Sequence, residues 1–215
     1  MAKKRSLSYD TKERFNNYWH QIDEITKLEP DSILEVGIWN SFVSDYLEKH
    51  GYDLITLDVK KDIEPDVVAD VRKMPFGEES FEMIIACEVL EHIPFDEFGK
   101  VLSQFYRIAG SYVIISVPDV RFYIKFNHEL IKFFDLKKVI NLPINEFLFK
   151  TGAYRFLEDI ETPNSKHHEW EIGRKSYPLE MIKSKIKEQG FKIIKDYRVF
   201  ESPYHHIFVL EKQID

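Results

Sequence analysis

The stretch Ile33–Asp58, ILEVGIWNSFVSDYLEKHGYDLITLD, decides the fold of this chain. Around its start, the apolar run of residues 32–36 predicts a short strand that ends at Gly37. Residues 40–50 then have the apolar spacing of a helix, and the glycine that follows is an expected helix end. Residues 54–58 predict a second strand. A strand, a helix and a strand in this order form the repeating unit of a parallel α/β sheet.

The same alternation extends in both directions along the chain. Residues 9–28 predict a leading helix, and two later helices are expected at 95–108 and 179–189. The turn Glu201-Ser202-Pro203 lies between the last two expected strands, and so short a connection joins only antiparallel strands. The remaining strands are expected at residues 66–69, 81–86, 112–117, 191–200 and 205–211. We therefore expect an α/β protein with a Rossmann-like, mostly parallel seven-stranded sheet, a terminal antiparallel hairpin and a helical cap insertion.

Charge and cysteine content limit the partners and the compartment. The chain has 30 Lys and Arg against 37 Asp and Glu, a net charge of -7, and an acidic surface repels phosphate backbones, so a nucleic-acid partner is disfavoured. Cys87 is the single cysteine, which excludes an internal disulfide framework and fits a reducing cytosol. No apolar run approaches the roughly 18 residues of a membrane span. We expect a cytoplasmic protein with no membrane span.

A ligand site is expected where the first two strands end. The turn Glu35-Val36-Gly37 leads from a strand to a helix, and such turns bring backbone N–H groups close to a ligand. Asp58 ends the second strand, where an acidic side chain can accept hydrogen bonds from both hydroxyls of a ribose. Dehydrogenases use the same pair of features. A nicotinamide oxidoreductase is nevertheless disfavoured, because the chain lacks G-x-G-x-x-G and ends in an antiparallel hairpin.

The segments that follow distinguish between these classes: VVADVRKMPF at residues 67–76, SFEMII at 80–85 and CEVLEHI at 87–93. This pattern resembles the class I S-adenosylmethionine (SAM) dependent methyltransferases, especially the group with an E-V-L-E-H signature. The resemblance covers residues 33–118 continuously and the final hairpin more loosely. It implies SAM as the cofactor, bound by Glu35, Gly37, Trp39, Asp58, Asp70, Val71, Cys87 and Glu88. Within this set it implies that Asp58 holds the ribose, that Asp70 and the backbone of Val71 meet the adenine, and that Cys87 and Glu88 line the methionine end.

The glycine loop departs from this family. Where the family has G-x-G-x-G, the chain reads Gly37-Ile38-Trp39-Asn40-Ser41, so Trp39 and Ser41 replace two glycines. If position 39 requires a positive φ, tryptophan there costs on the order of 1–2 kcal/mol. A shifted loop with Trp39 pointing into a neighbouring layer is the alternative. The departure also leaves open a catalytically weak or silent methyltransferase-like module that binds a protein partner.

Two histidines are the candidate catalytic residues. His168 and His92 are the expected general bases for transfer of a methyl group to an O or N of a small-molecule acceptor. His168 opens the stretch HEWEIG, which resembles a segment of small-molecule methyltransferases that returns the chain to the sheet. His205 and His206 are expected only to begin the final hairpin.

A metal site is the alternative use of the same histidines. Glu88, Glu91, His92 and His168 resemble the E-x-x-E-H set, with a downstream histidine, of metal-dependent methyltransferases. There a divalent ion grips the acceptor hydroxyls and lowers their pKa. The E-V-L-E-H motif is also common in methyltransferases without metal, where these side chains only shape the pocket. The sequence therefore predicts no metal as the first choice.

The chain is expected to form one methyltransferase domain over residues 1–215. Its expected parts are a leading helix at 1–30, a cofactor-binding half at 31–118, a cap insertion at 119–175, and a closing helix and hairpin at 176–215. The insertion is rich in aromatic residues, and helices are expected within it at 129–140 and 144–150. It follows a central strand at the edge where α/β sheets bind ligands, which favours a cap over the acceptor. An extra packing layer or a homodimer surface is the alternative.

Overall fold

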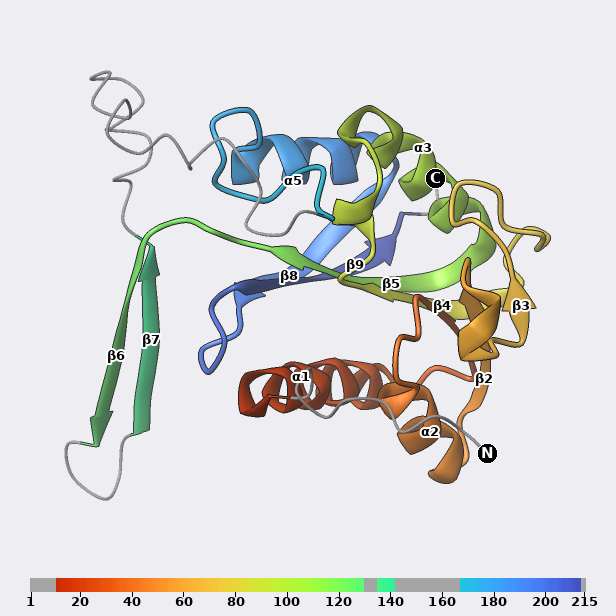
Figure 1. Cartoon of the computed structure of the whole chain (residues 1–215), viewed down its shortest axis with the longest axis horizontal. Coiled ribbons are helices and arrows are strands. Elements are labelled where there is room, and N and C mark those ends of the chain that lie inside the picture. The colour runs from red at the N-terminus through yellow and green to blue at the C-terminus, as the bar shows by residue number, and fades with distance from the viewer. Residues whose placement is uncertain (1–10, 130–134, 142–166, 214–215) are drawn as a thin grey trace.

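The computed structural model describes residues 11–129, 135–141 and 167–213. Its centre is a seven-stranded sheet of order β3-β2-β1-β4-β5-β9-β8 (Figure 1). The strands are β1 (Ser32–Val36), β2 (Asp53–Asp58), β3 (Val67–Val68), β4 (Phe81–Cys87), β5 (Ala109–Pro118), β8 (Phe191–Arg198) and β9 (His205–Lys212). The α-helices are α1 (Lys12–Leu28), α2 (Phe42–Lys49), α3 (Phe95–Ile108) and α5 (Leu179–Glu188), and two short 3-10 turns are η2 (Lys61–Ile63) and η3 (Leu90–His92). The predicted seven-stranded α/β fold is confirmed.

The pairing directions also follow the prediction. Strands β1 to β5 pair parallel to one another, whereas β9 pairs antiparallel to both β5 and β8. The connection from β8 to β9 is too short to cross the sheet, and this forces the antiparallel pair. Because β1, β2, β4 and β5 run parallel to one another, their carboxyl ends all lie at the same edge of the sheet.

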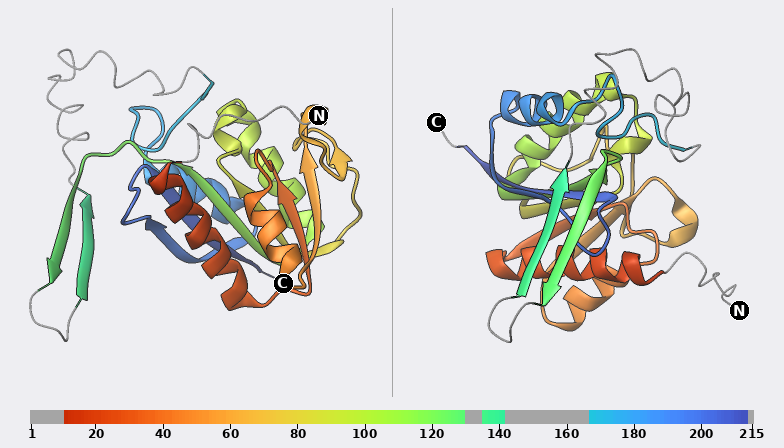
Figure 2. Two further views of the ribbon diagram at one scale, coloured as in Figure 1. Left: turned by 60° about the horizontal axis from the view of Figure 1, so that its bottom comes forward. Right: turned by 90° about the vertical axis from the view of Figure 1, so that its left-hand side faces the viewer.

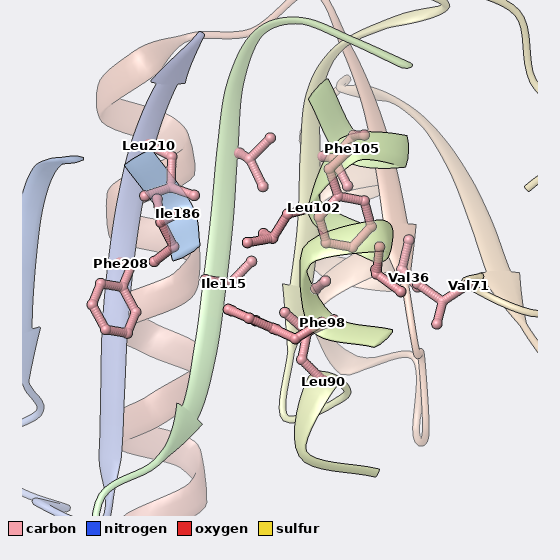
Figure 3. Packing of buried hydrophobic residues seen from close by; sticks show 14 of the residues in the cluster. Val36, Val71, Leu90, Phe98, Leu102, Phe105, Ile115, Ile186, Phe208 and Leu210 are labelled. Carbon is pink, nitrogen blue, oxygen red and sulfur yellow. The ribbon is translucent and has the colours of Figure 1, made fainter. Parts of the chain in front are cut away.

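Alternating residues of each central strand bury themselves against different helices. In β4, Ile84 belongs to a core shared with α3 and α5, whereas Met83 and Ile85 belong to a core shared with α1 and α2. Both faces are therefore covered, which explains why these strands read as continuous apolar runs. Figure 3 shows the first core, where Phe98, Leu102 and Phe105 of α3 pack on the sheet; Phe208, Leu210 and Ile186 also belong to it.

The insertion between β5 and α5 differs from the prediction. Its described part is an antiparallel pair, β6 (Tyr123–Glu129) and β7 (Asp135–Asn141), which stands away from the main sheet (Figures 1 and 2). The helix expected at 129–140 is therefore wrong. Leu136, Val139 and Ile140 have helical spacing, but pairing with β6 supplies their backbone hydrogen bonds, and two of the three are β-branched. The helix expected at 144–150 lies outside the described residues.

The two ends of this insertion lie side by side at the main sheet. Asp119 and Ile172 form a parallel β-bridge directly after β5. Ile172 N–H donates to the Pro118 carbonyl at 2.9 Å, and Val120 N–H donates to the Ile172 carbonyl at 2.9 Å. The chain therefore leaves and re-enters the domain at one point, beside the edge where the parallel strands end.

Among the described helices, none has the length and the apolar character that a membrane-spanning helix needs.

Candidate functional site

The turn after β1 is built around Gly37. This residue has φ +83°, and its N–H donates to the Leu57 carbonyl at 2.8 Å. A Cβ at this position would lie 2.3 Å from Cγ2 of Val89, closer than any real contact. Both the left-handed backbone and the approach of Val89 therefore require glycine here. The turn consequently packs directly on the segment that follows β4.

Trp39 and Ser41 adopt the backbone conformation that glycine would normally supply. Their φ angles are 32° and 57°, in the left-handed region that costs a residue with a side chain about 1 kcal/mol or more. The Trp39 ring is 46% exposed, with the Lys60 ammonium 5.1 Å from its centroid, so the alternative of an indole buried in a neighbouring layer is wrong. The loop keeps the shape of a glycine loop and stores strain in two side-chain-bearing residues.

Asp58 links this turn to the end of β2. One carboxylate oxygen accepts from Ile38 N–H at 3.2 Å, and the other accepts from Lys60 N–H at 2.8 Å. Each carboxylate oxygen has two lone pairs, so such a group can accept further hydrogen bonds. The side chain is thereby fixed at the sheet edge where the sequence predicts a ribose acceptor.

Asp70 lies in the segment after β3 and is oriented by Arg72. The guanidinium donates from Nε at 2.9 Å and from Nη2 at 2.6 Å, and Arg72 N–H donates at 2.8 Å. These hydrogen bonds lower the pKa of Asp70, so the group is an anion that acts only as an acceptor. Val71, its neighbour, buries its side chain in the core, which leaves its backbone as the part that can meet a ligand.

Glu35 is buried in the strand that leads into the turn. Desolvation raises its pKa to about 8, although hydrogen bonds from Ser44 of α2 offset part of this effect. One carboxyl oxygen, Oε2, has no hydrogen-bond partner among the described residues. Since the side chain lies against α2, its effect on a ligand at the turn would act through the packing of the loop and helix.

Cys87 and Glu88 end β4 at the same edge. Burial raises the pKa of the Cys87 thiol, so it is a neutral packing group. Glu88 has φ 56°, and its Oε1 accepts from Ser116 Oγ at 2.8 Å. Its Oε2 lies 3.8 Å from Nε2 of His205, so this histidine, which the sequence predicts only as the start of the hairpin, also faces the site.

Three residues of the predicted metal set come together next to Glu88. Glu91, His92 and His168 each offer one ligand atom, and these atoms lie within 4.8 Å of one another. Nε2 of His168 is 4.0 Å from Oε1 of Glu91, and the two histidine rings are 5.0 Å apart. We call these three residues the His–Glu cluster. Glu88, the fourth predicted residue, instead pairs with Ser116.

The His–Glu cluster has an unusual charge environment. Glu91 is fully buried, and neither of its carboxyl oxygens has a hydrogen-bond partner among the described residues. Burial, and then the charge of Glu88, raises its pKa well above the ordinary value. Burial also lowers the pKa of His92, so this imidazole favours the neutral form that can take up a proton or bind a cation.

The two residues that follow His168 hold it in this position. Glu169 N–H donates to the Glu91 carbonyl at 2.7 Å, and Trp170 Nε1 donates to the Leu90 carbonyl at 3.1 Å. The Trp170 side chain is completely buried and contacts Phe95 and Phe98 of α3, with ring centroids 5.2 Å away in both cases. His168 is thus held against η3 from the far end of the insertion.

Two polar residues of this region were missed by the sequence analysis. Glu171 accepts a hydrogen bond from Tyr204 at 2.9 Å and lies 3.0 Å from Nδ1 of His168. The spacing from His168 to Glu171 was visible in HEWEIG, but nothing in the sequence joins Tyr204 to it. The aromatic insertion, on which the expected homodimer surface depends, lies largely outside the described residues.

A methyltransferase domain model matches residues 34–115, the segment that contains the turn, Asp58, Asp70 and the His–Glu cluster except His168. No curated protein matches the sequence closely enough to count as a relative.

Several solved structures with the same fold are methyltransferases. Magnesium protoporphyrin IX methyltransferase from Synechocystis, with bound S-adenosylhomocysteine (SAH), has a TM-score of 0.62 at 11% identity, covering 99% of this chain and 90% of that one. The N-methyltransferase NodS from Bradyrhizobium japonicum, in complex with SAH, has a TM-score of 0.60 at 10% identity and covers 96% and 90%. The 1,6-didemethyltoxoflavin-N1-methyltransferase from Burkholderia thailandensis has a TM-score of 0.55 at 10% identity and covers 100% and 93%. At such identities the likeness shows the fold alone.

The domain match and the fold point to the same class. Residues 34–115 match a methyltransferase domain model, and the chain has the fold of class I SAM-dependent methyltransferases, with a glycine loop in which Trp39 and Ser41 replace the usual glycines.

The raised pKa of Glu35 predicts a pH-dependent loss of stability. The folded state keeps this proton up to about pH 8, whereas the unfolded chain releases it near the ordinary glutamate pKa of 4.5. Rising pH between these values therefore lowers the free energy of unfolding, on the order of a few kcal/mol in total. In Glu35→Gln this loss is absent, so the variant should gain stability relative to the wild type between pH 5 and pH 9. Chemical denaturation across this range measures the difference, and Glu78→Gln, at an exposed position away from Glu35, is the control. Parallel wild-type and Glu35→Gln curves would contradict the assignment.

Proposed function

We propose that the chain transfers a methyl group from SAM to an O or N of a small-molecule acceptor. The observation that carries this proposal is the convergence at one sheet edge of the glycine-type turn, Asp58 and the His–Glu cluster. A strand-end carboxylate beside such a turn is suited to a ribose, and an imidazole nitrogen with a free lone pair is suited to an acceptor that must lose a proton. The SAH bound in all three of the similar structures named above supports the same cofactor here.

The cofactor residues are proposed as follows. Asp58 accepts from the ribose hydroxyls, Asp70 accepts from the adenine amino group, and the backbone of Gly37 and Val71 approaches the ligand. Trp39 borders the loop from the solvent side, while Cys87 and Glu88 line the methionine end. Glu35 supports the turn from beneath, through α2.

The proposed chemistry needs little from the protein beyond positioning and one proton acceptor. Bound SAM supplies an electrophilic methyl group on its sulfonium. His168 or His92 takes the proton of the acceptor O–H or N–H as the new bond to the methyl carbon forms. The insertion returns at His168 and is proposed to cover the acceptor, which excludes water that would screen the site. Orientation of the two reactants then supplies most of the rate.

A divalent metal at the His–Glu cluster is a second candidate, which the structure favours more than the sequence does. A buried carboxyl with both oxygens unpartnered is costly unless something pairs with it. In addition, Nδ1 of His92 lies 2.8 Å from the His167 carbonyl and Nδ1 of His168 lies 3.0 Å from Glu171, and metal-binding histidines have such partners on the opposite nitrogen. Glu91, His92 and His168 fit a divalent cation, which would supply the charge that lowers the pKa of an acceptor hydroxyl.

Calorimetric titration with SAH tests the cofactor proposal. We expect the wild type to bind, and Asp58→Ala and Asp70→Ala each to weaken binding by roughly 1.5–3 kcal/mol, the cost of losing hydrogen bonds to a charged group. Asp62→Ala, an exposed carboxylate of η2, is the matched control and should bind as the wild type does. Circular dichroism checks that each variant is folded. Absence of heat with millimolar SAH would reject the proposal and favour the silent module that binds a protein partner.

A second titration, with Mn²⁺, separates the two uses of the His–Glu cluster. If the cluster binds metal, Glu91→Gln and His168→Ala should each lower Mn²⁺ affinity at least about tenfold, whereas His50→Ala on the exposed end of α2 should not. If His168 is a metal-free general base, the wild type binds no Mn²⁺. His168→Ala then lowers the rate of SAM consumption with an accepted substrate by about 10²–10⁴-fold while SAH affinity stays the same. Equal loss of turnover and SAH affinity would mean that His168 only holds the insertion in place.

A further inference from the structure

A chain of buried hydrogen bonds leads from the β8–β9 turn to His168. The Tyr204 hydroxyl donates to Oε1 of Glu171 at 2.9 Å, and the same oxygen lies 3.0 Å from Nδ1 of His168. The hydroxyl oxygen is also 3.4 Å from this Nδ1, but its single hydrogen is directed to the closer and charged Glu171 oxygen. Glu171 is fully buried and His168 is nearly so, with 11% of its side chain exposed. Glu171 therefore contacts the ring nitrogen of His168 that faces away from Glu91.

Arg174 determines the charge of Glu171. Its guanidinium donates to Oε2 of Glu171 from two nitrogens, Nε at 3.0 Å and Nη2 at 2.7 Å, and hydrogen bonds between two ionised groups are strong. Arginine stays protonated in proteins, so this partner holds Glu171 as a carboxylate. A carboxylate only accepts hydrogen bonds, and Tyr204 already donates to Oε1.

This arrangement fixes the tautomer of His168. Because Glu171 is an acceptor only, the hydrogen of the 3.0 Å contact belongs to Nδ1 of His168. In the neutral imidazole the lone pair is then on Nε2, the nitrogen 4.0 Å from Glu91. The reactive nitrogen faces the cluster, and both uses considered for His168, proton acceptor and metal ligand, need this form.

We infer that Glu171 is a positioning residue, which holds His168 in the Nδ1–H tautomer so that Nε2 can accept a proton or a cation at the His–Glu cluster. This role rests on the proposed function of His168, because the tautomer matters only if Nε2 takes part in binding or transfer. Arg174 acts through Glu171, by keeping it charged.

The variant Glu171→Gln tests this inference. Its amide has nearly the same shape as the carboxylate, but an NH₂ group that donates hydrogen bonds replaces one oxygen that accepts them. The amide oxygen should turn toward the donors of Arg174, which places the NH₂ group against Nδ1 of His168. A donor at Nδ1 requires the proton on Nε2, so we expect the tautomer to invert. In a serine-protease triad the same carboxylate-to-amide change lowers kcat by about 10⁴-fold for this reason.

The measurement is the ¹⁵N NMR spectrum of the imidazole nitrogens at pH 8, assigned with His168→Gln. The wild type should show a protonated Nδ1 and a lone-pair Nε2, and Glu171→Gln should show the reverse. Tyr204→Phe is the matched control, since it removes one donor to Glu171 but leaves the carboxylate, and it should keep the wild-type tautomer. Asp196→Asn, which alters a different ion pair, between Asp196 of β8 and Lys183 of α5, should also keep it.

Three outcomes would overturn the inference: a wild type with the proton on Nε2, a Glu171→Gln spectrum unchanged from the wild type, or inversion in Tyr204→Phe as well. The last would indicate loss of packing, with no specific effect of the acceptor. SAH titration of the same samples keeps the two proposals separate. Failure of SAH to bind the wild type rejects the proposed function, whereas the tautomer is read from the ligand-free protein.

Discussion

The site depends on a single buried side chain, the indole of Trp170. It joins the segment that returns from the insertion to the segment that follows β4, 80 residues earlier in the chain, through a hydrogen bond to the Leu90 carbonyl. Aromatic contacts with α3 bury the ring completely, so the hydrogen bond forms away from water, where its loss would leave two unsatisfied groups. His168 and Glu171 lie on either side of this anchor. Their positions relative to Glu91 therefore follow from the packing of a hydrophobic residue that itself takes no part in the chemistry.

Part of the backbone strain lies in the same region of the molecule. Among the described residues, three of the six non-glycine residues with positive φ, Trp39, Ser41 and Glu88, lie in the turns that follow the carboxyl ends of β1 and β4. Buried carboxyl groups at Glu35 and Glu91 add a further cost, because each has at least one oxygen without a hydrogen-bond partner among the described residues. The two apolar cores on the faces of the sheet offset these costs. A folded domain keeps such costs where the surrounding structure holds them, and functional sites are common places for them.

The sequence predicted the sheet well because its signals are local. Apolar runs, the glycine after β1 and the short β8–β9 turn each fix one element or one pairing, and together they give the strand directions. The insertion was predicted wrongly because Leu136, Val139 and Ile140 have helical spacing, and only pairing with β6 determines their conformation. The same contrast between local signals and contacts formed only on folding holds for the site. Glu91 and His92 could be identified from a motif, but the contact of Tyr204 with Glu171 joins residues 33 positions apart and appears only in the folded chain.

The β-bridge between Asp119 and Ile172 joins the two ends of the insertion, so the segment between them can be replaced by another of different length. Because the chain leaves and re-enters the sheet at neighbouring backbone positions, the loop between them closes on itself. Loop-closure entropy grows only slowly with length, so segments of different size can be accommodated there at little cost to the rest of the domain. Variation in the insertion would then change the surface next to the His–Glu cluster, while the sheet and the turn after β1 stay the same. A domain organised in this way can change that surface without having to refold.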